Sequence, residues 1–236
     1  AMPMEDIEKA SDLLVAKGSS RYDPIKLWAR ARDADAVLIQ KKLFARWKLA
    51  LLPRRTPIIF DFDDALFETS PLEEERYGPE RAGRRTEARR GRLAAILRRA
   101  SLVLAGNRFL ADYARRHSSQ VEVLPTGIDL AAYPEERVAR AAAEREAPGR
   151  ERVVGWIGCS ASLRYLLPLA APLAEVCRRV PGVRVVLVCN EFVDLPDVPM
   201  EKRLWSAGRE VVDLLGFDVG LMPLDDRPFS QGKCGF

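Results

Sequence analysis

The sequence holds few of the residues that build metal centres, disulfide frameworks and membrane spans. Its 236 residues include one histidine, His117, so a histidine-based metal site or a Ser-His-Asp triad has little to draw on. The four cysteines show no Cys-x-x-Cys spacing and lie mostly in apolar context, which favours buried free thiols in a reducing cytoplasm. No apolar run approaches about 18 residues, and the N-terminus lacks the basic start and apolar core of a secretory signal. We therefore expect a soluble, cytoplasmic protein.

Arginine, by contrast, is abundant and unevenly distributed along a chain of net charge +4. One predicted helix carries many arginines while its apolar positions, Leu93, Ile96 and Leu97, face inward. A solvated helix face is the plainest interpretation, and peripheral contact of residues 84–99 with an anionic membrane or a phosphorylated acceptor is the alternative. Nucleic acid is not an expected partner, because no basic stripe is interleaved with aromatic residues. The arginines concerned are Arg81, Arg84, Arg85, Arg89, Arg90, Arg92, Arg98 and Arg99.

The first half of the chain alternates short apolar runs with helical patterns, in the order that builds a parallel sheet. Asn107 is well placed to cap the helix that follows it. The predicted strands are 36–39, 57–60, 102–104 and 121–124, and the predicted helices are 6–16, 24–32, 84–99 and 108–116.

The alternation restarts after residues 135–152, a stretch rich in Ala, Glu and Arg that predicts a linker. Asp218 alternates with apolar neighbours in the last strand and is expected to be structural. The later strands are predicted at 153–157, 183–188 and 217–222, with helices at 163–180, bent or delayed by Pro168 and Pro172, and at 210–215. The sequence thus predicts an α/β protein with an N-terminal domain over 1–134, a linker over 135–151 and a C-terminal domain over 152–236.

Four segments in this order resemble GT-B glycosyltransferases of the group 1, or family 4, kind. They are Leu102-Val-Leu-Ala-Gly-Asn107, Val121-Glu-Val-Leu-Pro-Thr-Gly-Ile-Asp129, Val154-Gly-Trp-Ile-Gly158 and the tail that ends in Gly232-Lys-Cys-Gly-Phe236. The resemblance runs from about residue 36 to residue 236. Each segment is a weak signal by itself, but their order and separations are specific.

The resemblance implies two Rossmann-like, doubly wound domains, the second incomplete, and transfer of a sugar from a nucleotide-sugar donor to a saccharide or lipid-linked acceptor. It also implies a retaining, metal-independent reaction without a cofactor, in cell-surface polysaccharide or glycolipid biosynthesis at the inner face of the membrane. The carboxylates of Asp61, Asp63 and Asp64 would face the acceptor across a cleft. The donor-binding residues it implies are Gly158, Ser160, Ser162, Arg164, Gly232, Lys233 and Cys234.

The turn over residues 158–162 supports part of this assignment on physical grounds. A strand that ends in Gly-Cys-Ser-Ala-Ser before a helix offers amides and hydroxyls to a diphosphate, with Arg164 as a counter-charge. An ordinary turn with a serine N-cap is the alternative. Many family members place an arginine directly after this glycine, whereas this chain has Cys159 there.

The segment Asp61-Phe-Asp-Asp64 also resembles the first motif of haloacid-dehalogenase-type phosphatases, in which the first Asp is the nucleophile. The continuation Asp64-Ala65 departs from that motif, and no later acidic pair supplies Mg²⁺ ligands. Sugar transfer is therefore the favoured function. An Asp61-dependent phosphatase and a non-catalytic nucleotide-binding protein remain the alternatives.

Both ends of the chain read as incomplete. No strand is predicted before the helical pattern at 6–16, and only three strands are predicted in the second domain. A donor-site helix would follow Phe236 in the resembling proteins. We therefore expect the 236-residue chain by itself to bind donor weakly and not to turn over substrate.

Overall fold

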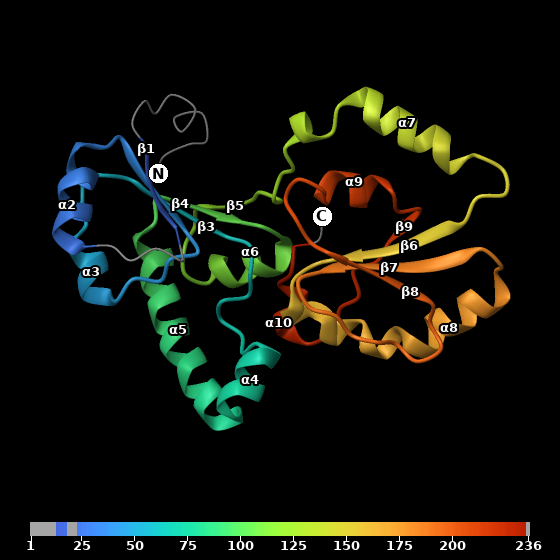
Figure 1. The fold of residues 1–236 in the computed structure, drawn as a ribbon. Coiled ribbons are helices and arrows are strands. Elements are labelled where there is room, and N and C mark those ends of the chain that lie inside the picture. The colour runs from blue at the N-terminus through green and yellow to red at the C-terminus, as the bar shows by residue number, and fades with distance from the viewer. Residues whose placement is uncertain (1–12, 18–22, 235–236) are drawn as a thin grey trace. The chain divides into compact units, whose positions relative to one another are not determined.

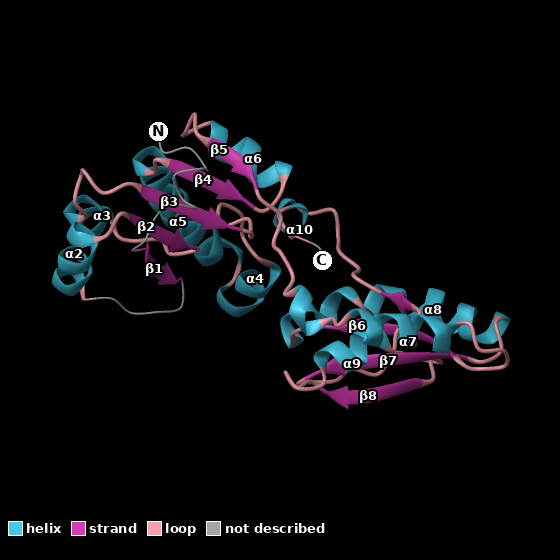
Figure 2. Cartoon of the chain, turned by 90° about the horizontal axis from the view of Figure 1, so that it is seen from above, coloured by secondary structure: helices cyan, strands magenta, loops and turns pink. Residues whose placement is uncertain are grey.

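The computed structural model describes residues 13–17 and 23–234, which fold into two compact units (Figure 1). Unit 1 comprises Ala1–Gly127 together with Asp226–Phe236, and unit 2 comprises Ile128–Asp225. Each unit is built on a parallel sheet, of five strands in unit 1 and four in unit 2 (Figure 2). The predicted α/β class with two Rossmann-like domains is therefore confirmed.

The sheet of unit 1 follows chain order, β1-β2-β3-β4-β5, and all neighbouring strands are parallel. Its strands are β1 (Leu13–Lys17), β2 (Ala36–Gln40), β3 (Ile58–Phe62), β4 (Leu102–Ala105) and β5 (Val121–Val123). Its helices are α2 (Pro24–Asp33), α3 (Arg46–Leu51), α4 (Pro71–Tyr77), α5 (Pro79–Arg99), α6 (Arg108–Arg115) and α10 (Pro228–Gln231).

One large apolar cluster forms the core of unit 1. Side chains from one face of the sheet, such as Ile39 and Phe60, pack in it with residues of α2, α3, α5 and α6. Phe60 and Phe62 stack with ring centroids 5.4 Å apart. Alternate strand residues, among them Ile59 and Leu104, form a separate small cluster on the other face. Burial of both faces explains why these strands read as continuous apolar runs in the sequence.

Three helices of unit 1, α2, α4 and α6, begin at side-chain caps. The predicted cap is confirmed, because Asn107 Oδ1 accepts a hydrogen bond of 2.9 Å from Leu110 N at the start of α6. Asp23 caps α2 in the same way and accepts from the backbone N–H groups of Ile25 and Lys26. These hydrogen bonds from amides also hold the pKa of the Asp23 carboxyl below its usual value.

The sheet of unit 2 has the order β8-β7-β6-β9, again with parallel neighbours. The chain therefore reverses its direction across the sheet between β6 and β9. Its strands are β6 (Arg152–Ile157), β7 (Val183–Cys189), β8 (Met200–Leu204) and β9 (Val219–Gly220), and its helices are η1 (Leu130–Ala132), α7 (Glu135–Arg145), η2 (Ser160–Tyr165), η3 (Leu167–Leu169), α8 (Ala170–Arg179) and α9 (Glu210–Leu215).

Three smaller apolar clusters, on both faces of the sheet, make up the core of unit 2. Leu173 of α8 packs with Val185 on one face, whereas Leu214 of α9 packs against the cluster of Val186 and Phe217. Gly155 in the middle of β6 makes this packing possible. A Cβ atom built there lies 2.1 Å from Cγ of the Phe217 ring, so the aromatic side chain occupies the space that a larger residue needs.

One predicted element of the first half of the chain is corrected. Residues 13–17 form strand β1, with Leu14 and Ala16 buried and the alternate residues exposed, so a helix over 6–16 is wrong at its end. The rest of that prediction, residues 6–12, lies outside the described residues. A strand thus precedes β2, where none was expected. A run of only five residues fits a strand and a helix almost equally well, and pairing with β2 decides between them.

Unit 2 differs from its prediction at three places. Strand β8 was not foreseen, so the sheet has four strands instead of three; its exposed and charged residues, such as Lys202, suit an edge position. The helix expected over 163–180 begins only at Ala170, after two short 3₁₀ segments, as Pro168 and Pro172 indicated. Strand β9 is limited to two residues.

The compact units also run differently from the predicted domain ranges. The end of α7 belongs to unit 2 and not to a linker, because Arg145 Nη2 donates to Leu215 O at 3.0 Å. The tail from Asp226 onward belongs to unit 1, to which Asn107 and Asp64 bind it.

Candidate functional site

Charged and amide side chains gather where three neighbouring strands of unit 1 end. Gln40 is the last residue of β2, Asp61 lies near the end of β3, and Asn107 follows β4 by two residues. Parallel strands bring their carboxyl ends to one edge of the sheet, which is where ligands bind in open α/β folds. The predicted residues Asp61, Asp63 and Asp64 are thus placed together at such an edge.

Two lysines neutralise part of the acidic motif. Lys41 Nζ contacts the carboxylates of both Asp63 and Asp64, the latter at 3.1 Å. Lys233 Nζ lies 3.4 Å from the other oxygen of Asp64. All four side chains are between one quarter and slightly over one third exposed. Lys41 was not foreseen from the sequence, although it directly follows an apolar strand.

Lys41 also adopts an unusual backbone conformation, with φ at 53°. A left-handed conformation of a residue other than glycine costs about 1 to 3 kcal/mol and persists where the surroundings impose it. Here the Lys41 N–H donates to Asp61 O at 2.8 Å while the ammonium group reaches the two carboxylates. The strained turn therefore fixes the lysine against the acidic motif from both its backbone and its side chain.

Asp61 has a different environment from the two carboxylates that follow it. Gln40 Nε2 donates to Asp61 Oδ2 at 2.9 Å, so a neutral amide holds this carboxylate. Among the described residues, no ion pair joins Asp61 to a lysine or arginine. Three carboxylates thus face two ammonium groups at this edge, and among the described residues both ammonium groups pair with Asp63 or Asp64 and not with Asp61.

The tail of the chain packs tightly onto the same strand ends. Asn107 Nδ2 donates at 3.3 Å to the carbonyl oxygens of both Gln231 and Lys233. A Cβ atom on Gly106 would lie 2.4 Å from Cys234 Sγ, and one on Gly232 would lie 2.4 Å from Cβ of Ala65. Two glycines of the chain therefore allow the tail to approach the strand ends. The predicted donor residues Gly232, Lys233 and Cys234 are brought together with the acidic motif.

Cys234 lies in surroundings that disfavour its thiolate. Burial raises the pKa of the Cys234 thiol, and the nearby Asp64 carboxylate raises it further. Lys41 and Lys233 act in the opposite direction but do not outweigh these effects. A reactive nucleophile needs a lowered pKa, so these surroundings do not activate the Cys234 thiol.

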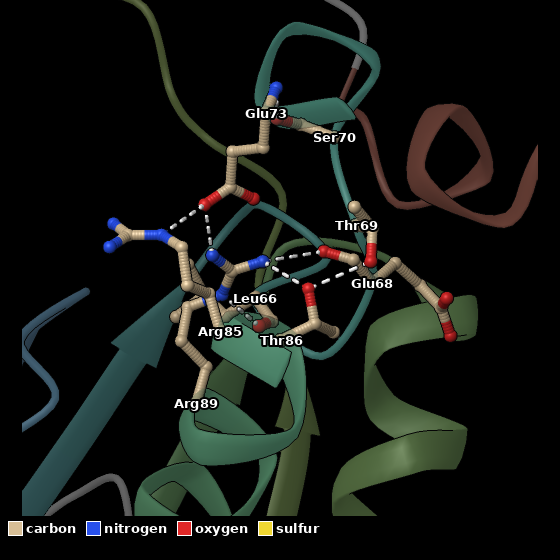
Figure 3. Close-up of polar contacts among 8 residues, drawn as sticks. All are labelled: Leu66, Glu68, Thr69, Ser70, Glu73, Arg85, Thr86 and Arg89. Atoms are coloured by element: carbon tan, nitrogen blue, oxygen red, sulfur yellow. Dashed lines mark hydrogen bonds and ion pairs between the residues drawn. The ribbon is translucent and has the colours of Figure 1, made fainter. Parts of the chain in front are cut away.

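Arg89 of α5 holds the loop that leads away from the acidic motif (Figure 3). Its guanidinium donates to the carbonyl oxygens of Leu66 at 3.1 Å and Glu68 at 3.0 Å, and to Thr86 Oγ1 at 2.9 Å. Its remaining nitrogen pairs with Glu73 Oε1 at 2.5 Å. One side chain thus links the start of α4 and the middle of α5 to the segment between Asp64 and α4.

Burial of Glu73 raises the pKa of its carboxyl, but the hydrogen bond and charge of Arg89 outweigh it, so the pKa lies below its usual value. Ser70 and Arg85 act in the same direction (Figure 3). Arg90 adds a second clamp and donates to Phe67 O at 2.7 Å. The loop after Asp64 is therefore fixed by two adjacent arginines.

A signal for Arg89 was present in the sequence. The buried side chains Ala82, Thr86, Leu93 and Ile96 follow helical spacing along α5, and residue 89 falls on the same face. An arginine on the buried face of an amphipathic helix predicts that loop carbonyl oxygens or carboxylates lie opposite to it. The arginines of α5 consequently do not act alike, because Arg89 and Arg90 are tied to the loop while others are exposed.

The turn after β6 in unit 2 carries the remaining predicted donor residues. Gly158 N donates to Val188 O at 3.2 Å, and a Cβ atom at Gly158 would lie 2.7 Å from the Trp156 ring. The glycine is thus required by packing. The following short 3₁₀ segment η2 holds Ser160, Ser162 and Arg164, and Arg164 Nε donates to Ala161 O at 3.3 Å. No carboxylate lies in this turn between residues 158 and 165, which separates it from the acidic strand ends of unit 1.

Asp218 has the structural role that its position predicts. It accepts a hydrogen bond of 2.7 Å from Val153 N and forms an ion pair with Arg150. Burial raises the pKa of the Asp218 carboxyl, but the hydrogen bond from Val153 and the charge of Arg150 outweigh it and lower the pKa overall. This aspartate joins the start of β6 to β9.

Within the described residues, no group of three or more His, Cys, Asp or Glu side chains is arranged to hold a metal ion. The same residues include no helix that is both long and apolar enough to cross a membrane.

Comparison with known proteins identifies the fold. No protein-family model and no curated protein sequence matches the chain. Among solved structures, it is similar to sucrose-phosphate synthase from Thermosynechococcus elongatus, with 19% identity and a TM-score of 0.56 over 83% of this chain and 52% of that one. It is also similar to an α,α-trehalose-phosphate synthase (UDP-forming) from Burkholderia vietnamiensis, with 15% identity and a TM-score of 0.51 over 86% of this chain and 57% of that one. The chain thus spans slightly more than half the length of these two proteins. Both are GT-B glycosyltransferases, and with its two parallel α/β units this chain has the GT-B fold.

Proposed function

We propose that the protein transfers a sugar from a nucleotide-sugar donor to a hydroxyl group of an acceptor. The proposal rests on the GT-B fold and on one observation: the residues that follow the strands differ in charge between the two units. Unit 1 presents carboxylates there, whereas the turn after β6 in unit 2 is free of carboxylates and rich in small residues. A diphosphate is favoured by the second environment and repelled by the first.

The donor diphosphate is assigned to the turn after β6. In unit 2 the strand order reverses between β6 and β9, and ligands of doubly wound sheets bind at the carboxyl ends of strands at such a reversal. Backbone N–H groups and the hydroxyls of Ser160 and Ser162 are the donors available there, with Arg164 as the nearby cation. Such preorganised donors would stabilise the negative charge of the leaving diphosphate without a metal ion.

The acceptor hydroxyl is assigned to the strand ends of unit 1. Asp61, which is held by Gln40, is the carboxylate suited to accept a hydrogen bond from it. Lys41 and Lys233 hold Asp63 and Asp64 in place through ion pairs. We further propose retention of anomeric configuration, no cofactor, and a role in cell-surface polysaccharide or glycolipid assembly at the inner face of the membrane.

Membrane contact through residues 84–99 of α5 is part of the same proposal. Because Arg89 and Arg90 are tied to the loop after Asp64, such contact would rest on the exposed arginines of the helix. These are Arg84, Arg85, Arg92 and Arg98.

The proposal is tested by titrating the protein with UDP-, GDP- and ADP-sugars in the presence of EDTA. One structural neighbour is named as UDP-forming, so UDP-sugars come first. We expect donor binding that survives EDTA and weakens in the Ser160→Ala/Ser162→Ala variant. A matched control, Ser118→Ala/Ser119→Ala in the loop before β5, should leave binding unchanged.

Turnover with an acceptor panel in the same assay tests the expectation that the 236-residue chain by itself does not transfer sugar. Strictly metal-dependent binding, or no donor binding by any longer form of the chain, would contradict the proposal. Hydrolysis of p-nitrophenyl phosphate with Mg²⁺ that is lost in Asp61→Asn would favour the phosphatase alternative, and nucleotide binding without transfer in any longer form would favour a non-catalytic protein.

A further inference from the structure

A basic pocket lies where α3 meets α5 in unit 1. The pocket has a volume of about 420 Å³, and its floor includes Leu49 and Leu52, which are buried. Arg46, Arg54 and Arg99 line it from three different positions in the chain. Such a convergence of guanidinium groups on one cavity costs free energy through like-charge repulsion, which binding of an anion would relieve.

The positive charge of this pocket is not balanced from within the described residues. Arg99 Nη2 donates to Pro53 O at 2.7 Å, which fixes its guanidinium at the pocket. Within the described residues, no ion pair joins Arg46, Arg54 or Arg99 to a carboxylate. Burial lowers the pKa of Arg99, and the charge of Arg54 lowers it further, so the two guanidinium groups act on each other.

The sequence around the pocket is one-sided in charge. Residues 36–60 contain six lysines and arginines and no aspartate or glutamate, whereas the whole chain has 38 basic and 34 acidic residues. The acidic side chains nearest in sequence stand at Asp35 and Asp61, outside this stretch. A segment so depleted of acid presents a positive potential to any negatively charged partner.

Two large apolar side chains stand exposed beside these cations. On α3, Trp47 is 59% exposed and Leu51 is 48% exposed. Four residues apart, they lie on one side of the helix, while Leu49 points into the core. Lys48 Nζ lies 5.2 Å from the centroid of the Trp47 ring. Exposed tryptophan and leucine flanked by basic residues are the composition that binds at the boundary between lipid headgroups and acyl chains.

We propose that this corner of unit 1 docks on an anionic phospholipid surface. The pocket between Arg46, Arg54 and Arg99 receives a lipid phosphate, and Trp47 with Leu51 enters the interface beside it. This surface contains none of the exposed arginines of α5 named above and shares with residues 84–99 the pocket residues Ala95 and Arg99. It extends the membrane contact proposed above to a defined pocket and an apolar pair, and it does not rest on sugar transfer. A lipid surface is favoured over nucleic acid because an exposed leucine beside a tryptophan gains free energy from apolar burial, not from base stacking.

The test is co-sedimentation of the full chain with vesicles of phosphatidylcholine alone or mixed with phosphatidylglycerol. We expect binding only to the mixed vesicles, weakened by salt. The Arg46→Gln/Arg54→Gln variant should bind about 30-fold more weakly, since each basic residue near an anionic surface contributes about 1 kcal/mol. The control variant Arg137→Gln/Arg140→Gln removes two charges from α7, away from the pocket. It should weaken vesicle binding by less than about threefold.

A second pair of variants separates the apolar contribution from charge. Trp47→Ala should weaken vesicle binding, whereas Trp205→Ala, which removes a tryptophan that is 47% exposed in unit 2, should not. Circular dichroism confirms that each variant is folded. Equal losses in the two charge variants, or in the two tryptophan variants, would overturn the proposal. So would saturation of the pocket by inorganic phosphate without vesicles, or tighter binding to a DNA duplex than to the mixed vesicles.

Discussion

The two units of this chain are built from the same kinds of element, but their strands are ordered differently. In unit 1 the described strands follow chain order, and helices α2, α3, α5 and α6 join one core cluster. In unit 2 the order reverses between β6 and β9, and apolar clusters lie on both faces of the sheet. A sheet with a reversal has a ready-made position for a ligand, whereas a sheet without one must build its site from side chains.

The strand ends of the two units reflect this difference. Unit 2 needs only small residues at its reversal, and the turn after β6 supplies them. Unit 1 instead assembles Gln40, Lys41 and the acidic motif at the ends of two strands, β2 and β3, and completes the set with Lys233 from the tail. The site in unit 1 is therefore the more elaborate one, and it depends on more contacts.

The largest expected effect tests how closely the core of unit 2 is packed. Gly155→Ala should destabilise the protein by about 3 kcal/mol, because its Cβ would overlap the buried Phe217 ring. Gly106→Ala in unit 1 should cost somewhat less, about 2 kcal/mol, because its Cβ would overlap Cys234 Sγ, the end of a side chain that can rotate, but would also lie 3.1 Å from Cα of Asp63. Thermal unfolding measures both changes.

The control for this pair is Phe217→Leu, made alone and together with Gly155→Ala. The double variant should recover part of the stability lost in Gly155→Ala, as expected for two residues in contact. Strictly additive losses would show that the clash with Phe217 is not the cause.

The next effect concerns the loop that unit 1 must hold in place. Arg89→Met should reduce the free energy of unfolding by about 2 to 3 kcal/mol, because it leaves Glu73 and two loop carbonyl groups without their partner. Arg84→Met on the exposed side of the same helix should change it by less than about 0.5 kcal/mol. Chemical denaturation measures the free energy of unfolding of both variants. Equal losses would show that the contacts of Arg89 with the loop do not stabilise the protein.

The third prediction compares how substitutions at the strand ends of unit 2 and of unit 1 change the affinity for the donor. Ser160→Ala/Ser162→Ala should weaken nucleotide-sugar binding by at least about tenfold, since one hydrogen bond to a charged group contributes about 1.5 kcal/mol. Asp61→Asn in unit 1 should keep the donor affinity within about twofold of the unmodified protein, because the diphosphate is assigned to unit 2. Isothermal titration calorimetry gives both values. A larger loss in Asp61→Asn than in the serine variant would reverse the assignment.

The smallest expected effect is the dependence of stability on pH. The pKa of Glu73 in unit 1 and that of Asp218 in unit 2 both lie below their usual values in the folded protein. Each therefore contributes stability that is present above the unfolded pKa and is lost as pH falls through the folded pKa. Glu73→Gln and Asp218→Asn should each flatten the acid side of a plot of stability against pH. An unchanged acid slope in either variant would show that its carboxylate gains nothing from its partners.

Much of the fold could be predicted, and the exceptions have a physical pattern. Strands such as β3 and β7 are apolar because both sheet faces are covered, so their sequence alone identified them. Strand β8 is an edge strand whose Glu201 and Lys202 carry no apolar signal, and it was missed. Strand β1 was read as helix because its pairing with β2, which no local pattern contains, decides its structure.

The residues of the candidate site in unit 1 also fall into two groups, those that local sequence predicted and those that it did not. Asp61, Asp63 and Asp64 follow an apolar strand, so local sequence placed them at a sheet edge. Their partners come from elsewhere: Lys41 lies on the neighbouring strand end, and Lys233 is 169 residues away from Asp64 in the sequence. Long-range pairing of this kind depends on the folded topology. Arg89 combines a distant contact with a readable local signal, its place on the buried face of α5.

The chain leaves unit 1 after Gly127 and returns to it at Asp226, so unit 2 is inserted into unit 1 in covalent terms. During synthesis, unit 1 must wait for residues 128–225 before its last segment emerges. At about 5 to 20 residues per second, this interval lasts about 5 to 20 s. For that time Asp64 lacks Lys233 and Asn107 lacks the carbonyl groups of the tail. The contact of Lys233 with Asp64 is therefore a late step of folding, because it can form only after residues 128–225 have been synthesised.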